Sequence, residues 1–143
     1  MLGTLARWLR ILGYDTVFDP ALDDHQLARL ALAQDRVLLT RDRALAEKRG
    51  VRTLLIESEQ LDDQIRQVLA DLQLEVEQSF TRCPVCNALL ESIDREAVQD
   101  RVPAYVARTH KSFKHCPGCG RVYWRGSHWR QMDERLARLR DDS

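Results

Sequence analysis

The sequence lacks any apolar run long enough to cross a membrane, which takes about 20 consecutive apolar residues. Its first residues, MLGTLARWLRILG, are interrupted by two arginines and do not have the form of a secretory signal peptide. These two absences argue against a membrane-spanning or secreted protein, and we expect a cytoplasmic one. The 143 residues suffice for one ordinary domain, or for a small domain with a minimal module attached.

Cysteine is absent except at four positions, which form two Cys-x-x-Cys pairs, Cys83 with Cys86 and Cys116 with Cys119. Each pair places two thiolates on one tight turn, and two such turns complete the tetrahedral ligand set of a structural zinc ion. Two disulfides would instead need an oxidising compartment, and a redox motif would explain one pair but not both. We therefore expect one Zn²⁺ bound by all four cysteines.

The stretch between the two pairs, residues 87–115, is expected to be too short to build an apolar core of its own. We therefore expect the metal to hold this module together, since zinc binding in comparable modules contributes about 10–16 kcal/mol of apparent free energy. His110 and His115 flank the second pair, but four cysteines already fill a tetrahedron. Both histidines are expected at the surface or on a phosphate. Ser127 is expected to cap a terminal helix that runs from His128 to about Arg140.

Acidic residues are missing from residues 101–132, although the whole chain holds 22 acidic and 22 basic residues. The same stretch carries seven basic residues, whereas residues 15–100 hold 18 acidic and 10 basic ones. It also carries five aromatic residues: Tyr105, Phe113, Tyr123, Trp124 and Trp129. Cations suit phosphates and rings stack on bases, so the stretch predicts a nucleic-acid-binding face.

The candidate contacts on this face are Arg121, Arg125 and Trp124, and Arg7 and Arg10 are candidates to join it. A simpler reading of Trp124 and its neighbour Trp129 is that they only cover the small metal module. We expect one or two of the rings to be core and the acid-free stretch to be a real electrostatic face.

The first 72 residues alternate between helical and strand patterns. Helices are expected over 5–12, after Asp23 or Asp24, over 43–49, and from Ser58 or Glu59 to 72; strands are expected over 15–18, 36–40 and 51–56. The last helix is expected to bury an apolar face made of Leu61, Ile65, Val68, Leu69 and Leu72. This alternation predicts an α/β domain with a parallel sheet, in which the apolar segment 36–40 is the central strand.

Acidic side chains follow two of the predicted strands. Asp42 comes just after 36–40, and Asp23 and Asp24 come after 15–18. Carboxylates that meet at the carboxyl ends of strands can hold a divalent cation, which activates a water and stabilises the charge of a phosphodiester under cleavage. The alternative, for each of these aspartates, is that it only caps its helix.

The neighbours of Asp42 are further candidates. Thr40 is expected to hydrogen-bond within the turn and to orient the Asp42 carboxylate. Arg41 and Arg43 would either contact phosphates or point to solvent. Gln64, on the last predicted helix of this domain, faces either the cleft or, as the simpler expectation, the solvent.

The ordered motifs MLGTLARWLRILGYDT, LLTRDRAL, RCPVCN, CPGCGRVYW and GSHWRQM together resemble the Mut-seven C-terminal RNase domain family over nearly the whole chain. The resemblance implies a PIN-like three-layer nuclease domain over residues 1–78, and a zinc ribbon with a terminal helix over 79–143. It implies hydrolysis of RNA with Mg²⁺ or Mn²⁺. It points to Asp42 as one metal-binding acid and to Asp24 as the second, with Asp23 as the alternative.

The chain departs from this family pattern at its start. The resemblance implies a strand of the type Phe-Leu-Val-Asp before Met-Leu-Gly, and its aspartate would be a metal ligand. A natural start further upstream is the simpler expectation. If the chain does begin here, we expect an impaired ribonuclease or, alternatively, an inactive RNA- or tRNA-binding protein. A missing strand would also expose a sheet edge and favour self-association. A third class, a protein-interaction module, is disfavoured because a partner surface need not avoid acids so completely.

Overall fold

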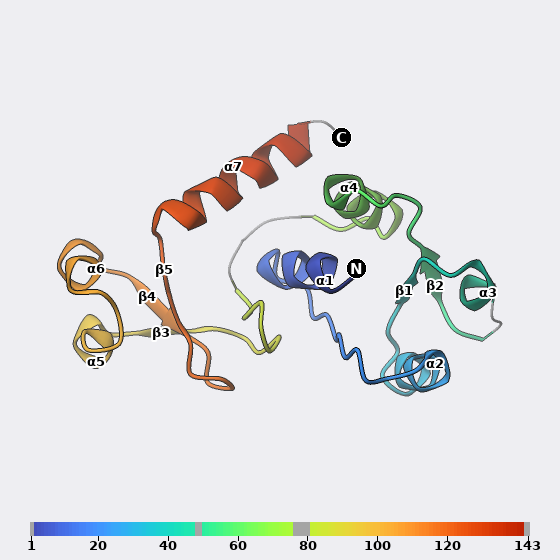
Figure 1. Ribbon diagram of the computed structural model, residues 1–143, viewed down its shortest axis with the longest axis horizontal. Coiled ribbons are helices and arrows are strands. Elements are labelled where there is room, and N and C mark those ends of the chain that lie inside the picture. The colour runs from blue at the N-terminus through green and yellow to red at the C-terminus, as the bar shows by residue number, and fades with distance from the viewer. Residues whose placement is uncertain (1, 48–49, 76–80, 142–143) are drawn as a thin grey trace. The chain divides into compact units, whose positions relative to one another are not determined.

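The computed structural model describes residues 2–47, 50–75 and 81–141, without the side chains of 127–129 and 140–141. The chain forms two compact units (Figure 1). The first unit comprises Met1–Leu5 and Val17–Leu74, and the second comprises Ala6–Thr16 and Glu75–Ser143. Helix α1 (Leu2–Ile11) therefore gives its first turn to one unit and its remainder to the other.

The first unit alternates helices with two parallel strands. Its elements are α2 (Asp24–Ala33), β1 (Leu38–Thr40), α3 (Arg43–Ala46), β2 (Thr53–Leu55) and α4 (Leu61–Asp71). Strands β1 and β2 pair in parallel, with Leu39 opposite Leu54. The expected mixed α/β fold with a small parallel sheet is confirmed, and this sheet has two strands within the described residues.

Apolar residues from strands and helices form the core of this unit. Ala31, Leu38 and Leu45 are buried together, so α2 and α3 both cover β1. On α4, Ile65 and Val68 are 0% and 1% exposed, three residues apart on one helix face. Burying a side chain of this size contributes roughly 1.5–3 kcal/mol. The spacing of apolar residues predicted this face correctly.

The strand predicted over residues 15–18 is wrong, and the two other predicted strands are shorter than expected. Val17 and Phe18 are 40% and 43% exposed. The backbone N–H of Thr16 donates to the side chain of Asn87 at 2.9 Å, so this amide bonds to a side chain and not to a neighbouring strand. The helix predicted over 43–49 ends at Ala46, and residues 48–49 lie outside the described part.

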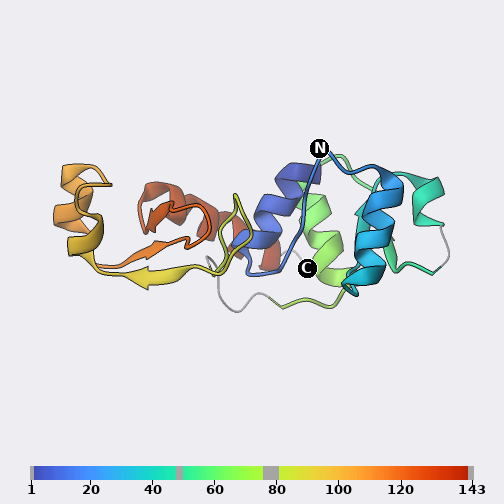
Figure 2. The ribbon, with the colours of Figure 1, turned by 90° about the horizontal axis from the view of Figure 1, so that it is seen from below.

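The second unit contains a three-stranded antiparallel sheet in the order β3-β4-β5. Its elements are β3 (Glu91–Ile93), α5 (Arg95–Val98), α6 (Ala104–Thr109), β4 (Phe113–His115), β5 (Val122–Trp124) and α7 (Ser127–Asp141). Figure 2 shows β3 and β4 side by side, with α5 and α6 beyond one end of the strands. These two short helices are not among the elements that the sequence predicted.

Between the two cysteine pairs lies an apolar core, contrary to the expectation that this stretch is too short for one. Val98, Val106 and Phe113 are 0%, 1% and 3% exposed and pack together. Val122 and Trp124 of β5 pack against them. The core forms because Val98 of α5 and Val106 of α6 pack against Phe113 of β4, and these two helices were not expected from the sequence.

Helices α1 and α7 pack together inside the second unit. Ile11 and Met132 are buried against each other, with Trp8 and Tyr123 beside them. The guanidinium of Arg135 lies 5.1 Å from the centroid of the Trp8 ring, within cation–π range. No helix within the described residues combines the length and apolarity needed to traverse a membrane.

Candidate metal centre and acidic strand end

The four cysteines come together in the second unit. All four sulfur atoms lie within 4.8 Å of one another. The Cys83 and Cys119 sulfurs are 3.7 Å apart, and the Cys86 and Cys116 sulfurs are 3.0 Å apart. A tetrahedral site with metal–sulfur bonds of about 2.3 Å has sulfur–sulfur distances of about 3.8 Å. The cysteines are therefore positioned to bind one metal ion.

The two Cys-x-x-Cys turns, called knuckles here (residues 83–88 and 116–121), have the same hydrogen-bond pattern. In each, the first cysteine donates its N–H to the carbonyl five residues later and accepts from the N–H four residues later, at 2.8–2.9 Å. The residue four places on is Asn87 or Gly120, with φ of 72° and 80°. Glycine and asparagine adopt this left-handed conformation at the lowest cost, so each knuckle is specified by its own sequence.

The thiols differ in how easily they ionise. Burial raises the pKa of Cys83. Hydrogen bonds from the Tyr123 hydroxyl and from backbone N–H groups of the knuckle outweigh this effect and lower the pKa to about 7. The hydrogen bond to Cys116, together with burial, raises the pKa of Cys86 to about 12. Sulfurs this close oppose each other's ionisation. The positive charge of a bound divalent cation would offset this repulsion between thiolates, which are the form that binds a metal.

Arg10 was a candidate for the nucleic-acid-binding face, but it lies in the interior. The residue is 7% exposed, and its guanidinium donates to the carbonyls of Pro84 and Val85 in the first knuckle. Burial lowers its pKa, while the nearby Cys83 and Cys86 thiolates act in the opposite direction. The prediction that Arg10 contacts a nucleic acid is wrong, whereas Arg7 on the same helix is exposed.

At the carboxyl end of β1, the predicted Thr-Arg-Asp turn is present. Thr40 is 7% exposed, and its hydroxyl accepts a hydrogen bond from the N–H of Asp42 at 3.0 Å. Asp42 is also the N-cap of α3, because its Oδ1 accepts from the N–H groups of Ala44 and Leu45 at 2.9 and 3.4 Å. No hydrogen bond within the described residues reaches the other carboxylate oxygen. The turn therefore holds an exposed carboxylate in one orientation.

Asp23 and Asp24 lie at the start of α2. Asp23 is the N-cap: its carboxylate accepts from the N–H of Gln26 at 2.8 Å, and the Gln26 side chain accepts from the Asp23 N–H at 2.9 Å. Asp24 is the first residue of the helix and is exposed. Within the described residues, the cysteines are the only group of three or more potential ligands whose donor atoms converge. The three aspartates do not form such a group.

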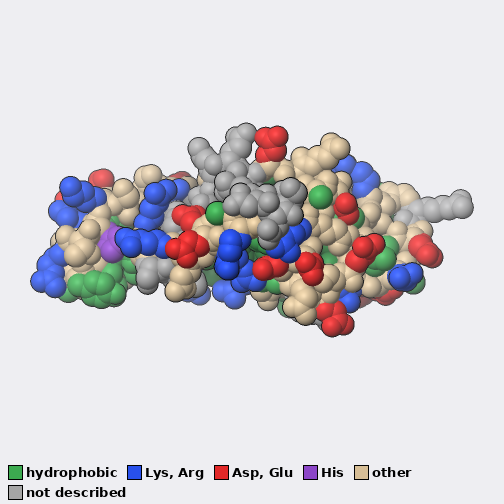
Figure 3. All heavy atoms as spheres, turned by 90° about the horizontal axis from the view of Figure 1, so that it is seen from above, with side chains coloured by type: hydrophobic (Ala, Val, Ile, Leu, Met, Phe, Trp, Pro, Cys, Tyr) green, Lys and Arg blue, Asp and Glu red, His purple; other side chains and the backbone are tan. Residues whose placement is uncertain are grey.

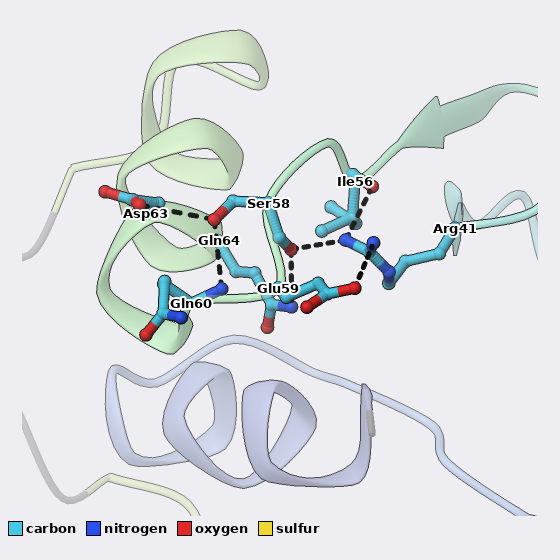
Figure 4. Close-up of polar contacts among 7 residues, drawn as sticks. All are labelled: Arg41, Ile56, Ser58, Glu59, Gln60, Asp63 and Gln64. Atoms are coloured by element: carbon cyan, nitrogen blue, oxygen red, sulfur yellow. Dashed lines mark hydrogen bonds and ion pairs between the residues drawn. The ribbon is translucent and has the colours of Figure 1, made fainter.

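Arg41 connects the strand-end turn to the loop between β2 and α4 (Figure 4). Its guanidinium donates to the carbonyls of Ser58 at 2.5 Å and Ile56 at 3.4 Å, and lies 3.8 Å from the Glu59 carboxylate. Arg43 is exposed at the first position of α3. Of the two arginines beside Asp42, Arg41 is thus engaged within the protein and Arg43 faces solvent.

The expectation that Gln64 faces solvent is wrong. It is 2% exposed, and its amide nitrogen donates to the Ser58 carbonyl at 2.9 Å, the same carbonyl that accepts from Arg41 (Figure 4). Its position could have been read from the sequence, because it lies next to Ile65 and four residues before Val68 on the buried face of α4. The two side chains fix the loop that lies beside the carboxyl end of β1.

The acid-free stretch presents basic side chains and one prominent ring. Arg121 and Arg125 are exposed, and Tyr105 on α6 is 62% exposed. Trp124 packs against the apolar core, and the Trp129 side chain lies outside the described residues. Figure 3 shows basic side chains, one histidine and hydrophobic side chains gathered at the left end, where α6 lies. Tyr105 was expected only as one of the aromatics of this stretch and not as a candidate contact, although it is exposed.

The chain thus contains a small α/β unit with an oriented carboxylate at a strand end, and a second unit whose four cysteines are positioned to bind a metal ion. The Mut7-C RNAse domain family model matches residues 1–136. The chain therefore belongs to the Mut7-C RNAse domain family, as the motifs indicated. This membership indicates a nuclease-like function and RNA as the partner. No curated protein and no solved structure gives a significant match.

Proposed function

We propose that this protein is a metal-dependent endoribonuclease, which hydrolyses phosphodiester bonds in RNA and binds RNA through a zinc ribbon. The observation that carries the proposal is the family match over residues 1–136, together with the oriented carboxylate of Asp42 at the end of β1. We assign residues 1–78 to a PIN-like three-layer nuclease domain and 79–143 to the ribbon with its terminal helix.

Asp42 and Asp24 are the acids proposed to hold Mg²⁺ or Mn²⁺. Asp42 uses one carboxylate oxygen as a helix cap, which leaves the other for a metal. Asp24 is exposed, and no hydrogen bond or ion pair engages its side chain within the described residues. Asp23 is the weaker candidate because its carboxylate already caps α2. When bound, the ion would supply an activated water and offset the charge of the phosphodiester.

The substrate is proposed to complete this site. Mg²⁺ is usually held by one or two carboxylates together with waters and substrate phosphates. Two aspartates fit that pattern, whereas a site built by protein alone would need more converging oxygens. Arg43, exposed beside Asp42, is the proposed phosphate contact. Thr40 and Arg41 act through the turn and the neighbouring loop, because both side chains are already engaged there.

The four-cysteine centre is proposed to hold Zn²⁺. Four thiolates in a tetrahedron are a soft ligand set that selects zinc among common divalent ions. The same unit presents Tyr105, Arg121 and Arg125 on a stretch without acids, which suits phosphates and stacked bases. Trp124 contributes mainly by packing.

Self-association through the edge of β1 stays a prediction, which sedimentation analysis would test.

The proposal is tested by cleavage of a labelled single-stranded RNA with Mg²⁺, with Mn²⁺ and with EDTA. We expect cleavage with either metal and none with EDTA. Asp42→Asn should lower the rate by about 100-fold or more, the loss typical of removing one preorganised electrostatic group. Its fold should survive, since asparagine caps helices as well as aspartate. Asp94→Asn, at the N-cap position of α5 in the other unit, is the matched control.

The second candidate is an RNA- or tRNA-binding protein without catalysis. The observation that favours it is that no three acids converge within the described residues. In that case RNA would bind in a salt-dependent manner, and no metal would produce cleavage. Equal cleavage rates for the unaltered protein and Asp42→Asn would contradict the proposed active site.

A further inference from the structure

The first knuckle is bound by a segment from the opposite end of the chain. From α1, Arg10 donates through Nη1 to the carbonyls of Pro84 at 2.9 Å and Val85 at 3.1 Å. Its Nε donates to the carbonyl of Thr16 at 2.8 Å. One guanidinium thus joins the knuckle and the segment that follows α1, and all of these residues belong to the second unit.

Side chains at the first knuckle also form hydrogen bonds with the segment that follows α1. The side chain of Asn87 accepts from the N–H of Thr16 at 2.9 Å and donates to the Asp15 carboxylate at 2.6 Å. Arg82 donates to the carbonyls of Gly13 at 3.3 Å and Asn87 at 2.9 Å. Bonds therefore run in both directions between residues 10–16 and residues 82–87, which lie about seventy positions apart in the sequence.

The charge of the metal centre gives Arg10 a reason to be buried. A guanidinium removed from water is costly unless it is paired and hydrogen-bonded. Four thiolates around one divalent cation leave a net negative charge. Arg10 lies against the turn between Cys83 and Cys86, so its positive charge offsets part of that excess. Its bonds to both carbonyls within that turn also fix the orientation of the knuckle.

We propose that Arg10 is a positioning residue of the metal centre, and that residues 10–16 and the metal stabilise each other's binding to the first knuckle. If this segment raises metal affinity, bound metal must stabilise the segment by the same factor. The inference goes beyond the proposed function, since neither RNA nor cleavage enters it. The metal module would then begin within α1 and not near residue 79.

The test measures zinc affinity of the full chain by competition with a chromogenic chelator. Arg10→Met keeps the aliphatic stem but removes charge and donors, and should weaken zinc binding by about 10–100-fold, as loss of an outer-shell partner does. Arg10→Lys keeps the charge and should recover part of the loss. Arg7→Met, an exposed arginine on the same helix, should bind zinc like the unaltered protein.

A second measurement covers the case in which Arg10→Met does not fold. Hydrogen exchange of the unaltered chain is compared with zinc bound and after chelation. The amides of Leu12, Gly13 and Tyr14, which bond to carbonyls within α1, should exchange faster without the metal. Zinc affinity of Arg10→Met equal to that of Arg7→Met, or exchange at these amides that is unaffected by chelation, would overturn the proposal.

Discussion

The two candidate metal sites of this protein are built in opposite ways. The four cysteines bring their sulfurs within 4.8 Å of one another, whereas no three acids converge within the described residues. Each cysteine knuckle closes through hydrogen bonds between its own residues. Asp23 and Asp42 each bond to the helix that follows them. The cysteine ligands are thus gathered by the protein alone, whereas the proposed acidic site would need further ligands.

This difference predicts how the two sites fill. Zinc should bind the free protein tightly, because its ligands are already gathered and binding is coupled to folding. Mg²⁺ or Mn²⁺ should bind the free protein weakly and gain ligands from RNA phosphates.

Cys116→Ser removes a buried ligand and makes the cysteine site as incomplete as the acidic one. We expect the loss of bound zinc, and with it most of the roughly 10–16 kcal/mol of apparent free energy that such an ion contributes. Elemental analysis of purified protein measures the metal, and hydrogen exchange reports which amides lose protection. Zinc bound at one per chain in the variant would contradict the four-cysteine centre.

Phe113→Ala tests whether the apolar core between the knuckles stabilises the module independently of the metal. Phe113 is 3% exposed, and truncating a buried phenylalanine costs about 3–5 kcal/mol. Denaturant unfolding of the zinc-loaded protein should show this loss, while one zinc ion remains bound in the native state. Ser112→Ala, at the exposed neighbouring residue, is the control. An unchanged unfolding midpoint for Phe113→Ala would mean that the metal alone holds the module.

Tyr105→Ala tests the proposed RNA-binding face, which belongs to the unit that holds the cysteines. Tyr105 is 62% exposed, and loss of a ring that stacks on a base costs about 1–3 kcal/mol of binding free energy. Fluorescence anisotropy with a labelled single-stranded RNA measures the effect. Tyr105→Phe keeps the ring and should retain most of the affinity. Equal affinities for Tyr105→Ala and the unaltered protein would remove this residue from the interface.

Asp23→Ala tests the assignment of Asp23 as a helix cap. Loss of an N-cap costs about 0.5–2 kcal/mol of stability, and asparagine at the same position should restore it. Asp24→Ala, one residue further on, should leave stability nearly unchanged but weaken RNA cleavage. Thermal unfolding and a cleavage assay on the three variants check both statements. If Asp23→Asn abolished cleavage and Asp24→Ala did not, the two roles would be reversed.

The sequence predicted the features that depend on near neighbours. The Cys-x-x-Cys spacing, the Thr40–Asp42 turn and the buried face of α4 all involve residues a few positions apart. Helices α5 and α6 were missed because four and six residues are too few to show a clear helical period. The core that they form with β4 and β5 was missed for the same reason.

The remaining errors come from partners distant in the sequence. The segment 15–18 was wrongly predicted as a strand, because the hydrogen bond from Thr16 to Asn87 joins residues 71 positions apart and leaves no local signal in the sequence. Arg10 reads as a surface cation for the same reason, since its carbonyl partners lie 74 and 75 positions away. Convergence of acids at a sheet edge likewise depends on tertiary structure, which spacing along the chain does not fix.

The protein alone gathers the ligands of the cysteine site, whereas RNA is proposed to complete the acidic one. The most direct test is calorimetric titration of Mn²⁺ into zinc-loaded protein, with and without single-stranded RNA, for the unaltered chain and for Asp42→Asn. We predict weak Mn²⁺ binding to the free protein and tighter binding with RNA, and that this gain is lost in Asp42→Asn. Tight Mn²⁺ binding without RNA, or the same gain in both proteins, would contradict the account.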